Sequence, residues 1–457
     1  MNTGTTFFSS YTFDSNANRL TEFQFCDNPK VSTFPVGAMR NLFYVQKLVW
    51  TGNGMTVIPA HAFRDLAHLE DLDISENELN KIETHSFSGV TDHIRQLNLS
   101  RNKLTSRSIL QEFSRTQWIA LQYLNLSYNS IDHLEEAIFK KMEKLLHLDL
   151  SSNGLQSISA SNFQHLHHLQ KLDLSRNSLH SVDIKAFIWT KSLSVLNLQH
   201  QETGKQQMDF TNAHDNSVKL SIKKIILSHT RLRDSNFWQL LQRVPYLKHL
   251  HAAHSGLSVL IPGGFRQTKL THVSLHHNHI YELFPDTFSG LEDSLEILNL
   301  KNNRLNKLDE LMVKNLKSLK VIDISLNRIE CNCSMQWFLK WLKLNSEEDS
   351  VLEHLNHGYD LKCSNLSEGG NINFETAMSD LKCENDTRRN RVNSTSTPLT
   401  SPNKQLSSNW VSMTAIFISA FLPTVILALI VLILISILRS RPKRKQCRCS
   451  ESEITDV

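Results

Sequence analysis

The sequence predicts a solenoid, a fold made by stacking one short repeat many times. A frame of apolar residues at relative positions one, four and six, with Asn at position nine, recurs every 23 to 29 residues of the 457-residue chain. Each copy is followed by a second apolar cluster, as at Ile58, Phe63 and Leu66, and the last copy leads into a cysteine-rich segment. Copies of the frame begin at Leu20, Val45, Leu69, Ile94, Leu121, Leu145, Leu169, Leu193, Ile222, Leu247, Leu270, Leu295 and Leu319.

The frame is explained by how stacked coils pack. Residues one, four and six point into the coil interior, where burying each Leu is worth roughly 1.5–3 kcal/mol. The Asn carries donors and an acceptor, so it can satisfy backbone groups where the chain turns out of the strand. A single repeat leaves both of its apolar faces exposed, whereas a stack buries them. We therefore expect residues 20–328 to form one solenoid of about thirteen repeats.

The segment 329–383 is predicted to close the end of the solenoid. The last coil has an open hydrophobic end, and a helix bearing apolar residues would cover it: Trp337, Phe338, Trp341 and Leu342. Four cysteines fall in the same segment: Cys331, Cys333, Cys363 and Cys383. They suit disulfides in an extracellular protein, and a zinc site is the alternative.

These residues resemble the leucine-rich repeat family over residues 20–326. The resemblance implies an α/β fold: a curved solenoid with a parallel β-sheet on its concave face and short helices or loops outside. The C-x-C-x-x-x-W-F-x-x-W pattern that begins at Cys331 is similar to the segment just outside the membrane in Toll-like receptors. That likeness implies the disulfides Cys331–Cys363 and Cys333–Cys383.

A membrane anchor is predicted near the end of the chain. Residues 411–438 form an uncharged run of 28 residues, long enough to cross a bilayer, and a buried core helix is the alternative. The basic residues that follow place the tail, 439–457, in the cytoplasm. Residues 384–410, rich in Asn, Ser and Thr, read as a flexible stalk. We expect a single-pass protein of the plasma membrane or endosome with its N-terminus outside.

The two termini carry further expectations. Residues 1–19 lack a basic start and a long apolar run, so we expect an incomplete N-terminal segment, with a reverse anchor as the alternative. In the tail, Cys447 and Cys449 are candidates for palmitoylation. Thr455 and Val457 match a PDZ-binding C-terminus. Glycosylation sequons occur at Asn98, Asn125, Asn332, Asn365, Asn385 and Asn393.

The candidate ligand surface lies on the late repeats, between the buried leucines of each strand. Ten cationic or ionisable residues gather on three consecutive copies: Lys223, Lys224, His229, Lys248, His249, His251, His254, His272, His276 and His277. Since neighbouring strands lie about 4.8 Å apart, they should form one patch. It could bind anions once the imidazoles are protonated. The alternatives are a solvated polar face and a metal site through His249, His251 and His254.

The predicted function follows from the resemblance and from what the sequence lacks. We find no catalytic motif and predict no cofactor. The likeness to Toll-like receptors implies a role in innate immune recognition, as receptor, co-receptor or decoy. The expected ligand is a protein, a microbial molecule or an anion on the concave face, and the receptor is expected to form a dimer. The nineteen-residue tail has no room for their cytoplasmic TIR domain. The alternative is a leucine-rich repeat adhesion or synaptic-organiser protein with a PDZ-binding tail. The segment from Gln199 to Lys219 is expected to bulge out as a polar loop.

Overall fold

The computed structural model describes residues 19–136, 138–204, 206–344, 361–364 and 373–381. The chain divides into two compact units. The first contains the described residues of 19–257 and 267–270, and the second contains 258–266 and the described residues from 271 onward. Each unit is described by itself.

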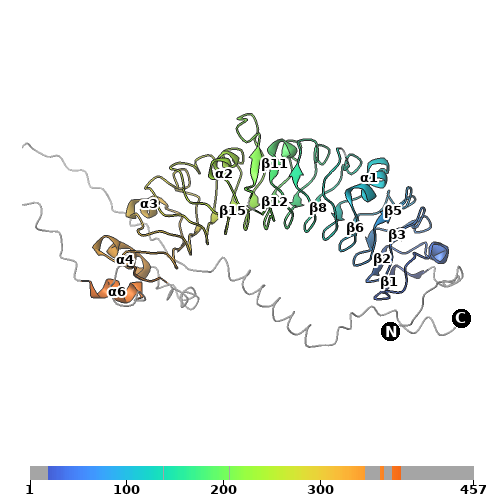
Figure 1. Ribbon diagram of the computed structural model, residues 1–457, viewed down its shortest axis with the longest axis horizontal. Helices are drawn as coiled ribbons and strands as arrows, with labels where there is room; N and C mark the ends of the chain where they lie inside the picture. Colours follow the sequence, from blue (N-terminus) through green and yellow to red (C-terminus); the bar gives the residue numbers. More distant parts are fainter. Residues whose placement is uncertain (1–18, 137, 205, 345–360, 365–372, 382–457) are drawn as a thin grey trace, which may run out of the picture. The chain divides into compact units, whose positions relative to one another are not determined.

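A parallel sheet lines the concave edge of the first unit, as the resemblance predicted (Figure 1). Its strands follow one another in chain order and pair in register, with Leu72 opposite Leu97 and Leu97 opposite Leu124. Each copy of the frame that begins between Leu20 and Leu247 contributes one strand. These strands are β1 Glu22–Cys26, β2 Lys47–Thr51, β4 Asp71–Asp73, β6 Gln96–Asn98, β7 Tyr123–Asn125, β8 His147–Asp149, β10 Lys171–Asp173, β12 Val195–Asn197, β14 Lys224–Ile226 and β15 His249–His251.

Short strands and helices form the outer side of the first unit. They are the strands β3 Val57–Ile58, β5 Lys81–Ile82, β9 Ser157–Ile158, β11 Ser181–Asp183 and β13 Asp209–Thr211, and the helices η2 Val36–Asn41, α1 Ser106–Arg115, η3 Ile184–Phe187 and α2 Asp234–Leu241. The core lies between these elements and the sheet. Phenylalanines stack there from coil to coil, with ring centroids 5.4 Å apart for Phe63 and Phe87 and 6.0 Å apart for Phe163 and Phe187. The outer cluster predicted at Ile58, Phe63 and Leu66 is fully buried.

The prediction of a polar loop from Gln199 to Lys219 is wrong over part of its length. Strand β13 lies in this segment and pairs with β11 through Phe210 and Val182. Met208 and Phe210 are buried in the core. The alternation of apolar and polar residues over Met208–Thr211 is typical of a strand with one buried face, and this local signal outweighs the polar composition around it.

The side chain at position nine of the frame joins each coil to the one before it. The Asn77 amide nitrogen donates to the carbonyl of Trp50 in the preceding coil at 2.8 Å, and its oxygen accepts the backbone N–H of Met55 at 3.4 Å. The same bridging occurs at Asn102, Asn129, Asn153 and Asn177. Three later coils have another residue in place of this Asn. Gln201 keeps both bridging contacts, Thr230 bonds within its own coil to Leu227, and Ser255 reaches back to Leu227 at 2.8 Å.

The second unit has its own parallel strands, β16 His272–Ser274, β17 Ile297–Asn299 and β18 Val321–Asp323, and the helix α3 Glu310–Asn315. It ends in a cap formed by η4 Cys333–Met335, α4 Gln336–Leu344 and α6 Phe374–Asp380. Phe338 is fully buried in the cap and its ring lies 5.9 Å from that of Phe374.

Disulfide chemistry holds the cap, which argues against the zinc alternative. The Cys331–Cys363 disulfide is present as predicted. Cys333 is also disulfide-bonded, while its expected partner Cys383 lies outside the described residues.

Several predictions fall on parts of the chain that the structure does not describe. These are residues 1–18, the stalk, the membrane-spanning run 411–438, the tail with Cys447, Cys449, Thr455 and Val457, and the sequons at Asn365, Asn385 and Asn393. Within the described ranges, none of the helices has the length and apolar character needed to span a bilayer.

The bridging role of Asn77 can be tested against a neighbour of the same residue type. Asn77→Ala should lower the free energy of unfolding by about 2–4 kcal/mol, because buried backbone groups of two coils lose their partners. Asn80→Ala, three residues away at an exposed position with only backbone hydrogen bonds, should change it little. Guanidinium chloride unfolding followed by circular dichroism measures both; equal midpoints for the two variants would contradict the bridging role.

Candidate ligand-binding surface

The structure brings five of the predicted site residues together on two neighbouring strands of the first unit. Lys224 in β14 lies opposite His249 in β15, and Ile226 lies opposite His251. Lys223 and Lys248 directly precede the two strands, and both are exposed. Backbone hydrogen bonds from Lys248 and His249 to the Lys223 carbonyl, at 2.8 and 3.0 Å, fix this alignment. Three ammonium groups and two imidazoles therefore share one part of the concave face.

A column of three histidine rings stands beside these strands. The rings of His229 and His254 stack with centroids 4.4 Å apart and planes 13° apart. His200 was not predicted as a site residue, yet its ring stacks on His229 at 4.3 Å and 9°. All three residues have positive φ, at 55°, 57° and 51° in chain order. Each occupies position eight of its frame, and this shared position is the sequence signal that identifies His200.

The surroundings of His200 favour its neutral form. Burial lowers the pKa of His200, and the nearby positive charges of Arg176 and of His254 lower it further. Protonation of His200 is therefore opposed by desolvation and by repulsion from nearby positive charge. Negative charge beside His200 would offset both effects.

The other three predicted histidines belong to the second unit. His272 begins β16, and its Nδ1 lies 2.8 Å from the hydroxyl of Thr271. The Nδ1 of His276 lies 2.8 Å from the Ser274 hydroxyl, and His277 contacts the Asn302 amide. That these residues join the lysines and histidines of the first unit in one patch stays a prediction. No cluster suited to hold a metal ion is found among the described residues.

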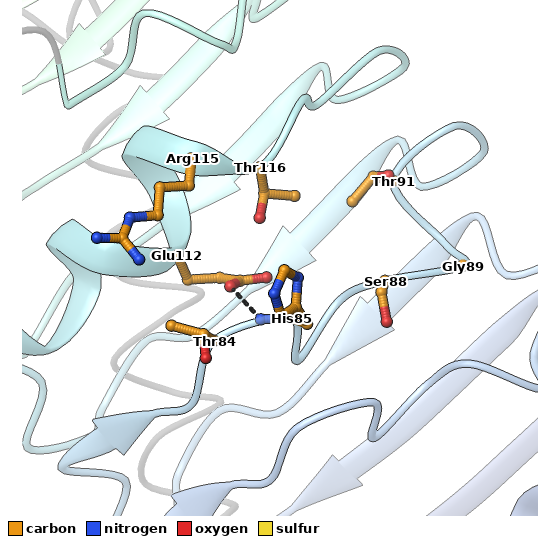
Figure 2. Close-up of a pocket in the computed structure, with 8 residues that line it drawn as sticks. All are labelled: Thr84, His85, Ser88, Gly89, Thr91, Glu112, Arg115 and Thr116. Atoms are coloured by element: carbon orange, nitrogen blue, oxygen red, sulfur yellow. Dashed lines mark hydrogen bonds between the residues drawn. The ribbon is translucent and has the colours of Figure 1, made fainter.

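A separate polar cavity of about 340 Å³ lies beside helix α1 (Figure 2). Eight residues line it: Thr84, His85, Ser88, Gly89, Thr91, Glu112, Arg115 and Thr116. Its buried carboxylate, Glu112, accepts the backbone N–H groups of His85 at 2.8 Å and Phe87 at 3.3 Å. These bonds hold the outer turn of the preceding coil against α1, so Glu112 has a structural role.

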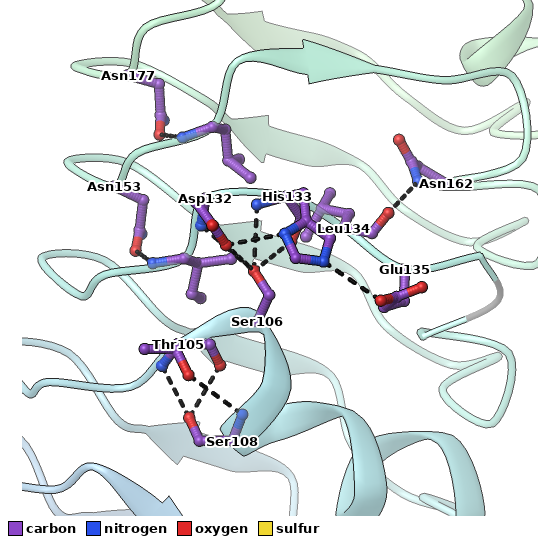
Figure 3. Close-up of polar contacts among 12 residues, drawn as sticks. Thr105, Ser106, Ser108, Asp132, His133, Leu134, Glu135, Asn153, Asn162 and Asn177 are labelled. Carbon is purple, nitrogen blue, oxygen red and sulfur yellow. Dashed lines mark hydrogen bonds and ion pairs between the residues drawn. The ribbon is translucent and has the colours of Figure 1, made fainter.

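Ser106, Asp132 and His133 lie together but are not arranged as a catalytic triad (Figure 3). The Ser106 hydroxyl lies 2.8 Å from the Asp132 carboxylate and accepts the backbone N–H groups of Asp132 and His133. The His133 ring faces Glu135 and Asp132, which raise its pKa, and neither ring nitrogen faces the hydroxyl. The Ser106 hydroxyl is buried and bonds to Asp132 and His133 of the next coil, so its role is to join two coils.

The geometry defines a leucine-rich repeat fold, and comparison with known families agrees. The family model described as "Leucine rich repeat" matches residues 44–104, 119–179 and 145–202, and a second model, "Leucine Rich Repeat", matches 269–291. The repeats are similar to human Toll-like receptor 5, at 32% identity over 107 residues, which are 23% of this chain and 12% of that protein. They are similar over a longer stretch to mouse CD180 antigen, at 26% identity over 348 residues, which are 74% of this chain and 40% of the relative.

A solved structure shows the same fold. In the crystal structure of the TLR13–ssRNA13 complex, the match has a TM-score of 0.53 at 22% identity and covers 79% of this chain and 57% of that one. The chain spans 12% to 40% of the length of the curated relatives it first matches. The chain thus has a leucine-rich repeat solenoid fold, and its repeats are similar to those of Toll-like receptor 5 and CD180 antigen.

Because the pKa of His200 is lowered in the folded state, we predict that the free energy of unfolding depends on pH through this residue. Between the pKa of the folded state and the unfolded value of about 6.5, the unfolded chain binds more protons, so the free energy of unfolding falls as the pH is lowered through this window. His200→Gln removes that contribution, and its stability should fall less between about pH 7.4 and about pH 5.5 than that of the wild type. The matched control is His168→Gln, an exposed histidine outside the column, which should follow the wild type. Identical pH profiles for His200→Gln and the wild type would contradict the prediction.

Proposed function

We propose that this protein is a ligand-binding leucine-rich repeat receptor that holds a phosphate-rich anion on the concave face of its first unit and holds it more tightly at acidic pH. The observation that carries the proposal is the placement of Lys223, Lys224 and Lys248 next to the column of His200, His229 and His254. The lysines supply charge at every physiological pH, whereas histidine imidazoles are side chains that gain charge as the pH falls.

Similarity to known proteins supports a role in recognition. The repeats resemble those of Toll-like receptor 5 and CD180 antigen, and the TLR13 structure of the same fold was solved with a single-stranded RNA. A nucleic-acid backbone presents regularly spaced phosphates, which lysines bind with release of counterions. A single-stranded nucleic acid is therefore the ligand class that we propose, and a free polyphosphate shares the same chemistry.

The place of the protein in the cell follows from its predicted anchor. With residues 411–438 crossing a membrane, the solenoid would face the outside of the cell or the lumen of an endosome, where acidification would charge the column. We propose that it acts there as a receptor, co-receptor or decoy in innate immune recognition, in a dimer or with a second receptor. The adhesion alternative depends on capture of a PDZ protein by Thr455 and Val457, and a pull-down with the tail peptide tests it.

Binding of fluorescent polyuridylate by the full chain, measured by anisotropy, tests the anion site. Affinity should be higher at about pH 5.5 than at about pH 7.4. Lys224→Gln combined with Lys248→Gln should weaken binding about tenfold at both pH values, the equivalent of about 1.4 kcal/mol. His229→Gln combined with His254→Gln should instead reduce the difference between the two pH values, because it removes two of the three imidazoles of the column.

A matched lysine variant tests whether the position of the charge matters, and a second probe tests whether the phosphate chain or the bases are recognised. Lys140→Gln changes an exposed lysine that lies outside the strands, and it should leave the affinity unchanged. Inorganic polyphosphate as a competitor distinguishes recognition of the phosphate chain from recognition of bases. Equal affinity at the two pH values, or equal losses for the strand lysines and for Lys140, would overturn the proposed site.

A further inference from the structure

Asn98 and Asn125 occupy equivalent places on the concave face of the first unit. Each is the last residue of its strand, β6 or β7, and the two lie opposite each other in the parallel register. The side-chain oxygen of Asn98 accepts the backbone N–H of Ser100 at 3.1 Å, and that of Asn125 accepts the N–H of Ser127 at 2.9 Å. This bond turns both amides in the same way and engages only their oxygens.

The amide nitrogens of these two residues are available for chemistry. In the described part of the chain, neither Nδ2 donates a hydrogen bond, and both side chains are partly exposed. Asn197 ends β12 in the equivalent place, but its Nδ2 donates to the Asp173 carboxylate at 2.8 Å. Asn197 is also followed by Leu198 and Gln199, so it lacks the hydroxyl residue of a sequon. The two residues that carry sequons thus leave the nitrogen open, whereas Asn197 uses it.

The cap shows that the chain suits the compartment where such a modification takes place. The Cys331–Cys363 disulfide, with Cys333 in a further disulfide, is typical of a protein that folds in an oxidising compartment such as the lumen of the endoplasmic reticulum. Glycosylation of Asn-X-Ser occurs in the same secretory route.

We propose that Asn98 and Asn125 both carry N-linked oligosaccharides, which stand side by side on the concave face. In the transfer, Nδ2 bonds to C1 of the first sugar of a polyprenyl-pyrophosphate oligosaccharide. The bond from C1 to the pyrophosphate oxygen breaks, the polyprenyl pyrophosphate leaves with the electron pair, and Nδ2 loses one proton. The modification does not depend on the anion site proposed above.

The paired glycans would cover an aromatic and cationic part of this face. Tyr123 precedes Asn125 by two residues in the same strand, so both side chains point to the same side of the sheet. Its ring is 38% exposed and meets the ring of His147 at 4.6 Å. Tyr128 is 45% exposed, and the Arg101 guanidinium lies 4.3 Å above its ring. Exposed tyrosines with an arginine are typical of protein contact sites, and here the sugars would shield them.

The two glycans would also limit where a ligand can bind on the concave face. Strand β14 is four strands beyond β7 in the sheet, or about 19 Å at the usual spacing of strands. Glycans on β6 and β7 would leave Lys224 and His249 open while they block a ligand that extends toward β4. The face available for recognition is therefore its later part.

The test uses sequon variants that keep the asparagines in place. The full chain is expressed in cultured mammalian cells behind an added signal peptide. The glycans are then released enzymatically in ¹⁸O water, which converts each glycosylated Asn to ¹⁸O-labelled Asp, and mass spectrometry detects the label at each site. Ser100→Ala and Ser127→Ala should each cause the loss of one glycan. Ser100→Thr and Ser127→Thr, the matched controls, keep the sequon and should keep the glycan. The Ser100 and Ser127 hydroxyls form no hydrogen bond with any described residue, so the alanine variants should fold.

A second measurement tests the shield itself. Hydroxyl-radical labelling of Tyr123 should be lower in Ser127→Thr, which keeps the sugar, than in Ser127→Ala, which lacks it. Unmodified Asn98 and Asn125 in protein recovered from the secretory route would overturn the proposal, above all if Asn365, Asn385 or Asn393 is glycosylated in the same sample. Modified asparagines with equal labelling of Tyr123 in the two variants would overturn the shield. Neither readout involves an anion, so failure here is distinct from failure of the proposed function.

Discussion

The structure depends on the side chain that joins each coil to its predecessor at position nine. The chain must turn out of every strand into a dry interior, where its backbone groups have no water to bond, and a buried amide such as Asn77 satisfies groups of both coils at once. At this turn the residue at position eight has a positive φ, in the left-handed region, as at Glu76, Arg101 and Tyr128. Because this turn recurs in every coil, the position-eight side chains of neighbouring coils lie next to one another. The contact between Arg101 and Tyr128 and the column of histidine rings are two results of the same constraint.

The histidine column lies where that bridging is chemically weakest. The three coils that carry it have Gln201, Thr230 and Ser255 at position nine instead of Asn, and the Thr230 hydroxyl donates to Leu227 of its own coil. A hydroxyl has one proton and offers fewer bonds than an amide, so the coils of Thr230 and Ser255 lose part of the usual connection, whereas Gln201 keeps it. Stacked rings supply contact between the coils in its place, at centroid distances of 4.3 and 4.4 Å. The departures from the repeat pattern and the candidate site therefore coincide, as expected where function outweighs local stability.

Burial explains which features the sequence could predict. Positions one, four and six are restricted to apolar residues because they fill the interior, so even the weak copies that begin at Leu193 and Ile222 predicted strands correctly. The Cys331–Cys363 pair followed from the family resemblance. His200 was missed because position eight accepts almost any residue type, and only the stacking of coils shows that its ring meets His229. The role of Glu112 was missed for a similar reason, since its two backbone partners lie 27 and 25 residues away in the chain.

The charges on the concave face of the first unit change along the direction of stacking. Its early strands carry Asp71 and Asp73, and Asp149 and Asp173 lie opposite each other on β8 and β10. Burial raises the pKa of Asp71 and of Asp149, and Asp173 adds to the effect at Asp149, so these carboxylates are held in a poorly solvated surface close to like charge. Lys47 lies opposite Asp71 and Lys171 shares a strand with Asp173, so these strands carry charge of both signs, whereas Lys223, Lys224 and Lys248 lie together at β14 and β15. Acidification acts on both parts in the same direction, because it adds charge to the imidazoles and moves the buried carboxylates closer to neutrality. The proposed preference for acidic pH thus follows from the distribution of charge over the whole face as well as from the histidine column.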